Sequence, residues 1–532
     1  MTEFQAFNPV SASDLAQLPE QPFGIISDLI RFHARQQPQH AALIAGESTL
    51  NYAQFDALID RVAAALQRDG LRVGDALAIC ATASIEYALV FFGGLRAGVA
   101  VAPLAPSSTA ESLAGMASDA EARLFFVDAA VAAELALLAD RLTARLITLD
   151  GSENAAVDSS RFVDWLAPEG AKPAAVTITP ELPFNIIYSS GTTGSPKGIV
   201  QSHGMRWLHV QRGAVSGYGP QAVTLLSTPL YSNTTLVSFF PTLTLGGCVV
   251  LMPKFEANAY LTLAQKHRAT HTMLVPVQYQ RLMAHPEFDR FDLSSFLYKF
   301  CTSAPFAAAL KEDVIKRWPG ALIEYYGMTE GGGTCMLAAH EFPHKLHTVG
   351  VPVPGHDIRL IDDNGNEVAA GQVGEIVGHS LGIMNAYHRQ PAKTAEAEWH
   401  DPSGKRFIRT GDIGRFDEDG FLTLMDRKKD MIISGGFNVY PSDLEAVLQQ
   451  HSAVQEAAVV GLPSERWGET PVAFVALKPG SDLTVEEVMD WANQRLGKTQ
   501  RLAAVELVET LPRSAIGKVL KRELRDTCKS RF

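Results

Sequence analysis

Short apolar runs alternate with amphipathic helical segments over about the first 430 residues, and this alternation limits the possible folds more than any other feature. Residues 52–68 show the helical part, because Phe55, Leu58, Ile59 and Val62 recur at the spacing of one helix face. The other predicted elements are strands at 76–80, 99–103, 223–228, 271–275, 299–303 and 322–326, with helices at 85–97 and 307–318. Strand–helix alternation predicts an α/β fold with parallel sheets that are covered on both faces.

The pattern changes from about residue 351 onward. Residues 358–361 and 367–369 are predicted to form a hairpin around the turn 363–366, and a strand is predicted at 374–378. A further strand at 421–425 leads into the charged run 426–430, where we place a domain boundary at Lys429; a solvated turn is the alternative. The tail beyond it is predicted to be a compact α+β unit, with helices at 442–451, 485–496 and 518–526 and strands at 457–461 and 472–477. The predicted domains are therefore residues 1–428 and 429–532.

Composition excludes several classes of protein. A length of 532 residues suggests about three or four domain-sized units. The net charge of −12 disfavours a nucleic-acid-binding surface. Five scattered cysteines without CxxC spacing fit a reducing cytoplasm, and the N-terminal residues show no pattern of a secretory signal. We therefore expect a cytoplasmic protein that binds no nucleic acid.

Residues 213–253 contain no Asp, Glu, Lys or Arg, which superficially suggests a membrane segment. Prolines, glycines and polar residues interrupt every apolar run before it could span a bilayer, so we expect no transmembrane segment. We interpret this region as buried strands and helices of a core. The alternative is that it also walls an apolar ligand pocket.

The sequence YSSGTTGSPKG at residues 188–198 follows the apolar run 184–188, which reads as a buried strand. Its glycines allow close approach of a ligand, and its hydroxyls and backbone N–H groups can donate to oxyanions. These properties suit a polyphosphate. The motif is not a Walker loop, because Pro196 precedes Lys197 and the glycine–lysine spacing differs. The alternative is a flexible linker, although linkers rarely sit on a strand end with a fixed lysine.

Three shorter motifs are weak alone. The sequence YYGMTE at 325–330 closes a predicted strand and offers an aromatic ring for a base, a hydroxyl for a phosphate and a carboxylate for Mg²⁺. The sequence TGD at 410–412 offers a carboxylate suited to a ribose diol. The loop RSAIGK at 513–518 presents Lys518 before a helix. Each alone could be an ordinary turn or a solvated lysine.

Together and in this order, the motifs resemble those of the adenylate-forming superfamily: acyl-CoA and aryl-CoA synthetases, the adenylation domains of peptide synthetases, and firefly luciferase. The resemblance covers residues 50–526, and the sequences DRKKDMI at 426–432 and GFNVYP at 436–441 are most similar to bacterial fatty acyl-CoA ligases. It implies a large N-terminal domain of two helix-covered sheets plus a small β-barrel-like part, followed by a small mobile α+β domain. The implied enzyme is an acid-thiol ligase that uses ATP, Mg²⁺ and coenzyme A. It makes an acyl-AMP and then an acyl-CoA, releasing AMP and pyrophosphate.

The resemblance also implies roles for particular residues. Lys518 would bridge the attacking carboxylate and the α-phosphate, Thr329 would touch that phosphate, and Glu330 would bind Mg²⁺. The β- and γ-phosphates would be held by Ser189, Ser190, Gly191, Thr192, Thr193, Gly194 and Lys197. Adenine and ribose would be held by Ser303, Ala304, Pro305, Tyr326, Gly327, Asp412 and Arg427. The acid pocket would include Tyr231, Ser232, Asn233, Met328 and Gly331. Lys429 would be the hinge, and Gly435 and Gly436 would line the coenzyme A tunnel.

Departures from the family pattern narrow the substrate and leave alternatives. Many aryl and fatty-acid ligases place His or an aromatic residue where this chain has Ser232 and Asn233, and residues 213–253 lack the aspartate that anchors an amino acid. An apolar fatty or aryl acid is therefore expected. One alternative acceptor is the thiol of a carrier protein. A distant alternative is a serine esterase or thioesterase that uses Ser380 in Gly378-His379-Ser380-Leu381-Gly382. A homodimer is left open beside a monomer.

Overall fold

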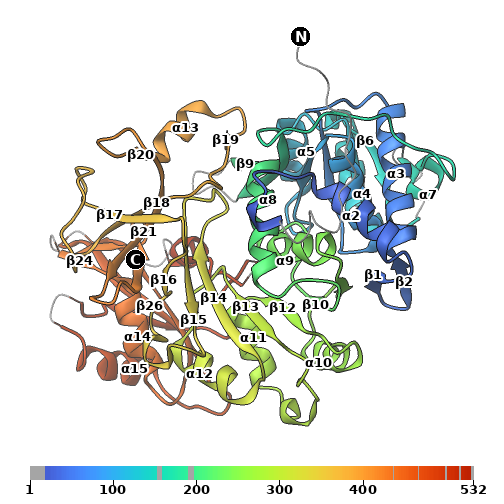
Figure 1. Ribbon diagram of the computed structural model, residues 1–532. Helices are drawn as coiled ribbons and strands as arrows, with labels where there is room; N and C mark the ends of the chain where they lie inside the picture. The colour runs from blue at the N-terminus through green and yellow to red at the C-terminus, as the bar shows by residue number, and fades with distance from the viewer. Residues whose placement is uncertain are drawn as a thin grey trace.

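The computed structural model describes residues 18–151, 159–189, 197–434, 437–464, 466–497, 500–514 and 517–528. Its strands form four sheets, of which two are large and mainly parallel and two are smaller and mainly antiparallel (Figure 1). The α/β class and the architecture predicted for it are confirmed. No helix in the described residues is long and apolar enough to cross a membrane.

The first large sheet has nine strands and carries part of the cleft described below. In spatial order the strands are β16 (Val351–Pro352), β15 (Thr334–Ala338), β14 (Ala321–Gly327), β13 (Tyr298–Cys301), β12 (His271–Leu274), β10 (Val223–Leu226), β11 (Cys248–Leu251), β1 (Ala41–Ala45) and β2 (Ser48–Asn51). Only β2, β15 and β16 join by antiparallel pairing. The parallel strands β13 and β14 therefore end side by side, where the chain enters two of the predicted site motifs.

The second large sheet has eight strands and holds the ends of the predicted phosphate motif. In spatial order they are β19 (Ala386–Tyr387), β9 (Lys197–Ser202), β8 (Pro183–Ser189), β4 (Ala100–Pro103), β3 (Ala76–Cys80), β5 (Leu124–Val127), β6 (Arg145–Thr148) and β7 (Ser159–Arg161). Strands β8 and β9 are antiparallel, with Ser189 opposite Lys197. This pairing brings the two ends of the motif together at the edge of the cleft.

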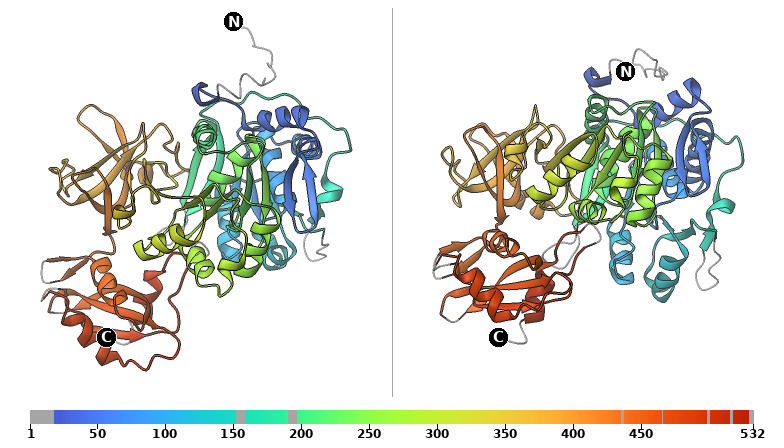
Figure 2. Two further views of the ribbon diagram at one scale, coloured as in Figure 1. Left: turned by 60° about the horizontal axis from the view of Figure 1, so that its bottom comes forward. Right: turned by 90° about the horizontal axis from the view of Figure 1, so that it is seen from below.

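Helices separate and cover the two large sheets, which gives five layers (Figures 1 and 2). One core joins the facing sides of both sheets to the inner helices α2 (Ile26–Gln36), α3 (Tyr52–Arg68), α4 (Ile85–Arg96), α8 (His203–Val215) and α9 (Asn233–Thr244). The outer helices are α5 (Ala110–Asp119) and α6 (Ala129–Leu135) on the eight-stranded sheet, and α10 (Ala257–Lys266), α11 (Pro276–Met283) and α12 (Ala308–Arg317) on the nine-stranded sheet. The short helix α7 (Phe162–Trp165) follows β7. The uncharged region 213–253 thus forms β10, α9 and β11, as its composition predicts.

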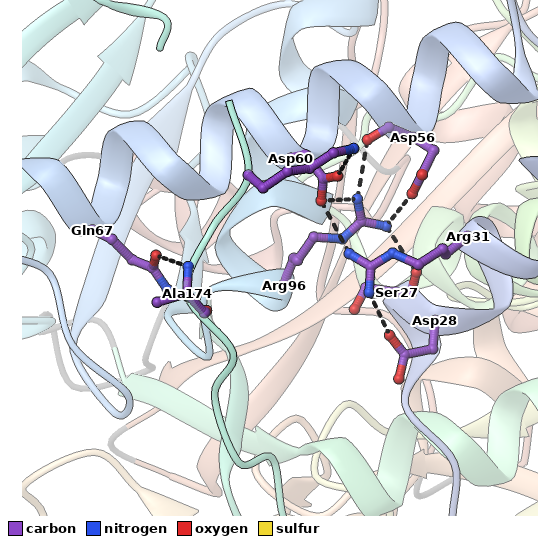
Figure 3. Close-up of polar contacts among 9 residues, drawn as sticks. Ser27, Asp28, Arg31, Asp56, Asp60, Gln67, Arg96 and Ala174 are labelled. Carbon is purple, nitrogen blue, oxygen red and sulfur yellow. Dashed lines mark hydrogen bonds and ion pairs between the residues drawn. The ribbon is translucent and has the colours of Figure 1, made fainter. Parts of the chain in front are cut away.

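An ion-pair cluster fastens three of the inner helices together (Figure 3). Arg96, at the end of α4, donates to Asp60 at 2.7 Å and to Asp56 at 2.6 Å, both on α3. Arg31 of α2 and Lys172 also donate to Asp60, at 3.0 and 2.6 Å. Burial opposes ionisation of Asp60, but the three cations outweigh burial and lower its pKa. The cluster therefore remains charged at neutral pH.

The third sheet is antiparallel and includes the predicted strand at 374–378. It contains β17 (Asp357–Ile361), β18 (Gly374–His379), β21 (Arg406–Phe416), β20 (Glu398–His400) and β22 (Leu422–Arg427). Strand β17 pairs along its whole length with β18. The predicted hairpin around the turn 363–366 is present as a short one, because Ile361 forms an antiparallel bridge with Glu367 and Val368 N–H donates to the Leu360 carbonyl at 3.0 Å. The short helix α13 (Pro391–Glu396) lies beside this sheet.

The fourth sheet contains only strands that follow residue 431 (Figure 2). It comprises β24 (Phe437–Val439), β23 (Ile432–Ser434), β26 (Gly468–Leu477), β25 (Val454–Ser464) and β27 (Ala504–Leu507). Helices α14 (Pro441–Gln449) and α15 (Val485–Asn493) pack on one face, and α16 (Lys521–Cys528) packs on the other. The C-terminal part therefore has its own core.

Candidate active site

A cleft of about 1660 Å³ lies where the carboxyl ends of β8, β13 and β14 meet the third sheet and the loop after β27. Its lining includes every described residue that was predicted to belong to the site. These are Ser189, Lys197, Tyr231, Ser232, Asn233, Ser303, Ala304, Pro305, Tyr326, Gly327, Met328, Thr329, Glu330, Gly331, Asp412, Arg427, Lys429 and Lys518. The predicted site residues Ser190, Gly191, Thr192, Thr193, Gly194, Gly435 and Gly436 lie outside the described residues.

One wall of the cleft presents a fixed carboxylate. Asp412 accepts a hydrogen bond from the Tyr326 hydroxyl at 2.8 Å, and its other oxygen lies 2.9 Å from Nε of Arg427. Antiparallel pairing of β21 with β22 places Asp412 opposite Arg427. Burial and the adjacent Asp412 hold the pKa of Tyr326 well above its ordinary value. Tyr326 is therefore a neutral donor that orients a carboxylate toward the cleft.

The loop after β13 is strained where it borders the cleft. Ser303 has φ of +84°, a conformation that L residues rarely adopt. Its hydroxyl lies 2.5 Å from the Thr234 hydroxyl at the start of α9. Such strain persists only where the surroundings enforce it, and it is concentrated at functional sites. The contact with Thr234 holds the backbone of Ser303, Ala304 and Pro305 in place along the wall.

Two residues that the motifs did not predict hold Thr329 and Glu330. The Gln201 amide donates to the Thr329 carbonyl oxygen at 2.6 Å, and the Tyr387 hydroxyl donates to Oε1 of Glu330 at 2.8 Å. The ammonium of Lys197 lies 4.8 Å from the centre of the Tyr387 ring. Tyr387 thereby connects the end of the phosphate motif to Glu330. No local signal marks it, because its place depends on β19 pairing with β9 nearly 190 residues earlier in the chain.

The donor set suits a magnesium ion that is bound together with phosphates. Glu330 lines the cleft with one oxygen held by Tyr387, which leaves the second carboxylate oxygen as a hard ligand. No group of three or more His, Cys, Asp or Glu residues in the described parts of the chain could hold a metal alone. Mg²⁺ characteristically takes one or two carboxylates plus substrate phosphates, so these residues fit that ion.

The described residues on either side of positions 515–516 bond to each other, and Gly517 lies against the outer helix α11. Ser514 N–H donates to the Lys518 carbonyl at 2.8 Å, and Arg513 donates to the Gly517 carbonyl at 2.7 Å. Gly517 has φ of +78°, and a Cβ there would lie 2.8 Å from Cγ1 of Val277 on α11. Only glycine therefore satisfies both the turn and the close contact.

The side chain of Lys518 faces the polar groups of the cleft. It is solvent-accessible within the cleft, yet burial by the surrounding protein lowers the pKa of its ammonium. Arg427 and Lys429 lower this pKa further, whereas Asp412 and Glu330 raise it. Lys518, Asp412 and Glu330 thus influence one another electrostatically, and all three line the same cleft.

Ser380 also lines the cleft, but its hydroxyl is used by the backbone. It donates to the Gly331 carbonyl at 2.8 Å and accepts from the N–H of Gly382 at 3.1 Å. Within the described ranges, no hydrogen bond joins Ser380 to a histidine. The residue therefore supports the turn at Gly331 and lacks the base that a serine nucleophile needs.

The fold and the cleft define a nucleotide-dependent α/β enzyme whose site is completed by a C-terminal loop. Two family models match the chain: "AMP-binding enzyme" over residues 30–388 and "AMP-binding enzyme C-terminal domain" over residues 443–518. The chain belongs to the family of AMP-binding enzymes.

Relatives and a solved structure support this assignment. The chain is 32% identical over 501 residues to a feruloyl-CoA synthase of Amycolatopsis sp, covering 92% of this chain and 96% of the relative. It is 31% identical over 507 residues to the fatty acid–[acyl-carrier-protein] ligase ScoC of Streptomyces coeruleorubidus, covering 93% and 95%. The crystal structure of ATP-bound MatB from Rhodopseudomonas palustris is similar with a TM-score of 0.84 and 29% identity, covering 94% of this chain and 99% of MatB.

Proposed function

We propose that this chain is an ATP-dependent carboxylate–CoA ligase. It forms an acyl-AMP from a fatty or aryl acid and then the acyl-CoA thioester, releasing AMP and pyrophosphate. The observation that carries the proposal is that Lys518 lines one cleft together with Asp412 and Glu330. The similarity to a feruloyl-CoA synthase supports coenzyme A as the acceptor.

In the first half-reaction, a carboxylate oxygen of the acid attacks the α-phosphorus of ATP and pyrophosphate leaves. This step needs positioning and charge neutralisation more than covalent help. Lys518 neutralises charge between the carboxylate and the α-phosphate, and Thr329 contacts that phosphate. Residues 189–197 hold the departing pyrophosphate. A magnesium ion bound with Glu330 would neutralise phosphate charge.

The wall of the cleft that carries Asp412 and Tyr326 orients the nucleotide in this proposal. Asp412, held by Tyr326 and Arg427, accepts hydrogen bonds from the ribose hydroxyls. Ser303, Ala304, Pro305 and Gly327 frame adenine in this proposal. Because the carboxylate is already oriented before ATP binds, little reorganisation accompanies binding.

In the second half-reaction, the thiol of coenzyme A attacks the acyl carbonyl and AMP leaves with the former carboxylate oxygen. We place the domain boundary at Lys429, so that residues 429–532 turn about it as a lid on residues 1–428. Gly435 and Gly436 then line the thiol entry. The present position of Lys518 in the cleft fits the first half-reaction.

The acid pocket is best placed between α8, α9 and the carboxyl ends of β12 to β14. Val237, Met273 and Phe300 provide apolar lining, beside Tyr231, Ser232, Asn233, Met328 and Gly331. An apolar skeleton of a fatty or aryl acid suits these contacts. We propose a cytoplasmic enzyme, and a homodimer stays a prediction.

A second candidate acceptor is a carrier-protein thiol, because ScoC is named as a fatty acid–[acyl-carrier-protein] ligase. The same protein preparation is incubated with ATP and a panel of fatty and aryl acids, with either coenzyme A or a phosphopantetheinylated carrier protein. Mass spectrometry identifies the thioester. Acyl-CoA formation supports the main proposal, and loading of the carrier alone supports the second. If neither thioester formation nor pyrophosphate exchange were detected, both candidate functions would be contradicted.

A further inference from the structure

We propose that the acid site binds a carboxylic acid whose apolar skeleton carries a second carboxylate, and that Arg212 holds this second group. The inference rests on the proposed ligase function and narrows its substrate class. It comes from a cationic side chain in the cleft that forms no ion pair or side-chain hydrogen bond among the described residues.

One face of α8 supplies a polar wall of the cleft. Met205, His209, Arg212 and Ser216 all line it, and their spacing of four, three and four residues places them on one side of a helix. Tyr325 and His356 line the cleft as well. Tyr325 alternates with Tyr326 along β14, so the two rings point to opposite faces of the sheet. The region around Arg212 is therefore separate from the Tyr326–Asp412 wall.

The guanidinium of Arg212 forms no ion pair and no side-chain hydrogen bond with any described residue. Burial lowers its pKa, and the phenol of Tyr325 opposes this effect. Arg206, one turn earlier, donates instead to Oδ1 of Asn185 at 3.0 Å and to Gln201. Arg96 is paired with two aspartates. A shielded guanidinium without a partner is unfavourable, so an anion that enters the cleft would be stabilised there.

The titratable groups linked with Arg212 among the described residues are two imidazoles, His209 and His356, and the phenol of Tyr325. His209 has a pKa well below its ordinary value because of burial and the nearby Arg212, Arg206 and His356. Burial and Arg212 likewise lower the pKa of His356 to about 4, so both rings are neutral near pH 7. Nδ1 of His356 is buried and has no hydrogen-bond partner in the described part of the chain. A bound carboxylate would accept from Arg212, while the neutral imidazoles add polar contacts.

The skeleton between the two carboxylates meets an apolar and aromatic lining. Phe300 and Tyr325 stack with ring centres 5.9 Å apart, and Phe300, Met273 and Val237 line the cleft. Val237 and the strand β10 belong to the uncharged region 213–253, whereas Arg212 is the residue just before it. The middle of the pocket is therefore lined by uncharged residues of region 213–253. Arg212 adds a positive charge at the edge of the pocket.

The test compares acids that share a skeleton and differ by one terminal carboxylate. Hexanoate is paired with adipate, and 3-phenylpropionate with 3-(4-carboxyphenyl)propionate. ATP–pyrophosphate exchange gives kcat/KM for each acid with wild-type protein, Arg212→Gln and Arg212→Lys. We expect the wild type to prefer the diacid in at least one pair. Arg212→Gln should lower kcat/KM for that diacid by about 30-fold or more, because a buried charge loses its partner, and leave the monoacid within about threefold. Arg212→Lys should retain part of the preference.

The control variant is Arg290→Gln, which removes an exposed guanidinium far along the chain from α8. It should leave kcat/KM unchanged for both acids of each pair. A wild-type preference for the monoacid in both pairs would overturn the inference, even if Arg212→Gln failed to fold. An equal decrease in kcat/KM for the monoacid and the diacid in folded Arg212→Gln would also overturn the inference. The proposed function fails differently, since then no acid of either kind would support exchange.

Discussion

At the scale of single residues, the site combines preformed contacts with one residue that arrives from the C-terminal part. Asp412 and Glu330 are each held by a tyrosine hydroxyl at 2.8 Å. Lys518 is held only through its loop, whose Gly517 packs against Val277. Motif resemblance predicted Asp412, Glu330 and Lys518. It could not predict Tyr387 and Gln201, because their roles arise from strand pairing and not from any local pattern.

Replacing Lys518 with alanine should separate the two half-reactions. We expect Lys518→Ala to lower acyl-adenylate formation by about 10²–10³-fold, since a preorganised charge contact is lost. Thioester formation from a supplied acyl-adenylate and coenzyme A should remain near the wild-type rate. Both rates are measured by rapid quench and mass spectrometry. Lys478→Ala removes an ammonium just after β26 that donates to the Ser452 carbonyl; it is the matched control and should affect neither rate. Equal loss of both half-reactions with the fold intact would refute the role of Lys518.

At the scale of elements, the packing of α2, α3 and α4 depends on the cluster around Arg96 and Asp60 (Figure 3). Both side chains are nearly inaccessible, with 4% and 2% exposed, whereas Lys172 in the same cluster is 67% exposed. Removing one partner of a buried pair leaves an uncompensated charge, whereas an exposed pair contributes little. Arg96 and Lys172 therefore form a natural comparison.

We expect Arg96→Met to destabilise the protein by about 3–5 kcal/mol, because Asp56 and Asp60 lose their shared cation. Lys172→Met should cost about 1 kcal/mol or less. Urea unfolding followed by circular dichroism measures both variants at pH 7. Similar decreases in the free energy of unfolding for the two variants would contradict the idea that burial of Arg96 makes its ion pairs important for stability.

The same cluster predicts a pH dependence of stability through Asp28. Burial raises the pKa of Asp28 from 3.8 to about 6, against the opposing effect of Arg31. A raised folded-state pKa favours folding below pH 3.8, and this contribution is lost as the pH rises through about 6. Asp28→Asn, which stays neutral, should therefore be more stable than wild type at pH 8 by about 2–3 kcal/mol and equally stable below pH 4. The unfolding midpoint from pH 4 to 8 measures this, with the exposed Glu47→Gln as control; a constant difference between Asp28→Asn and wild type would contradict it.

Element prediction from the sequence succeeded where a local pattern was strong, but it did not supply pairings between distant segments. The helix at 52–68 was predicted to its bounds, because an apolar stripe and an Asn51 cap define it. The hairpin around the turn 363–366 forms as a short one, whereas the pairing of β17 with β18 on its other side left no local signal. The position of Arg212 opposite Tyr325 and His356 likewise depends on three elements that are far apart in the chain.

At the scale of the whole molecule, three sheets and one C-terminal loop converge on a single cleft. The large sheets provide strand ends, the third sheet provides Asp412 and Arg427, and the loop after β27 provides Lys518. The arrangement explains why residues from 189 to 518 act together. In the proposed reaction, the carboxylate of the acid is joined to the α-phosphorus of ATP before the thiol attacks.

The transfer of an oxygen isotope tests this claim most directly. The acid is labelled with ¹⁸O in both carboxylate oxygens and turned over with ATP and coenzyme A. One labelled oxygen bridges carbon and phosphorus in the acyl-AMP and stays with phosphorus when the thiol expels AMP. We expect AMP that carries one ¹⁸O per thioester formed, measured by mass spectrometry. Unlabelled AMP, or label in inorganic phosphate together with ADP, would contradict it.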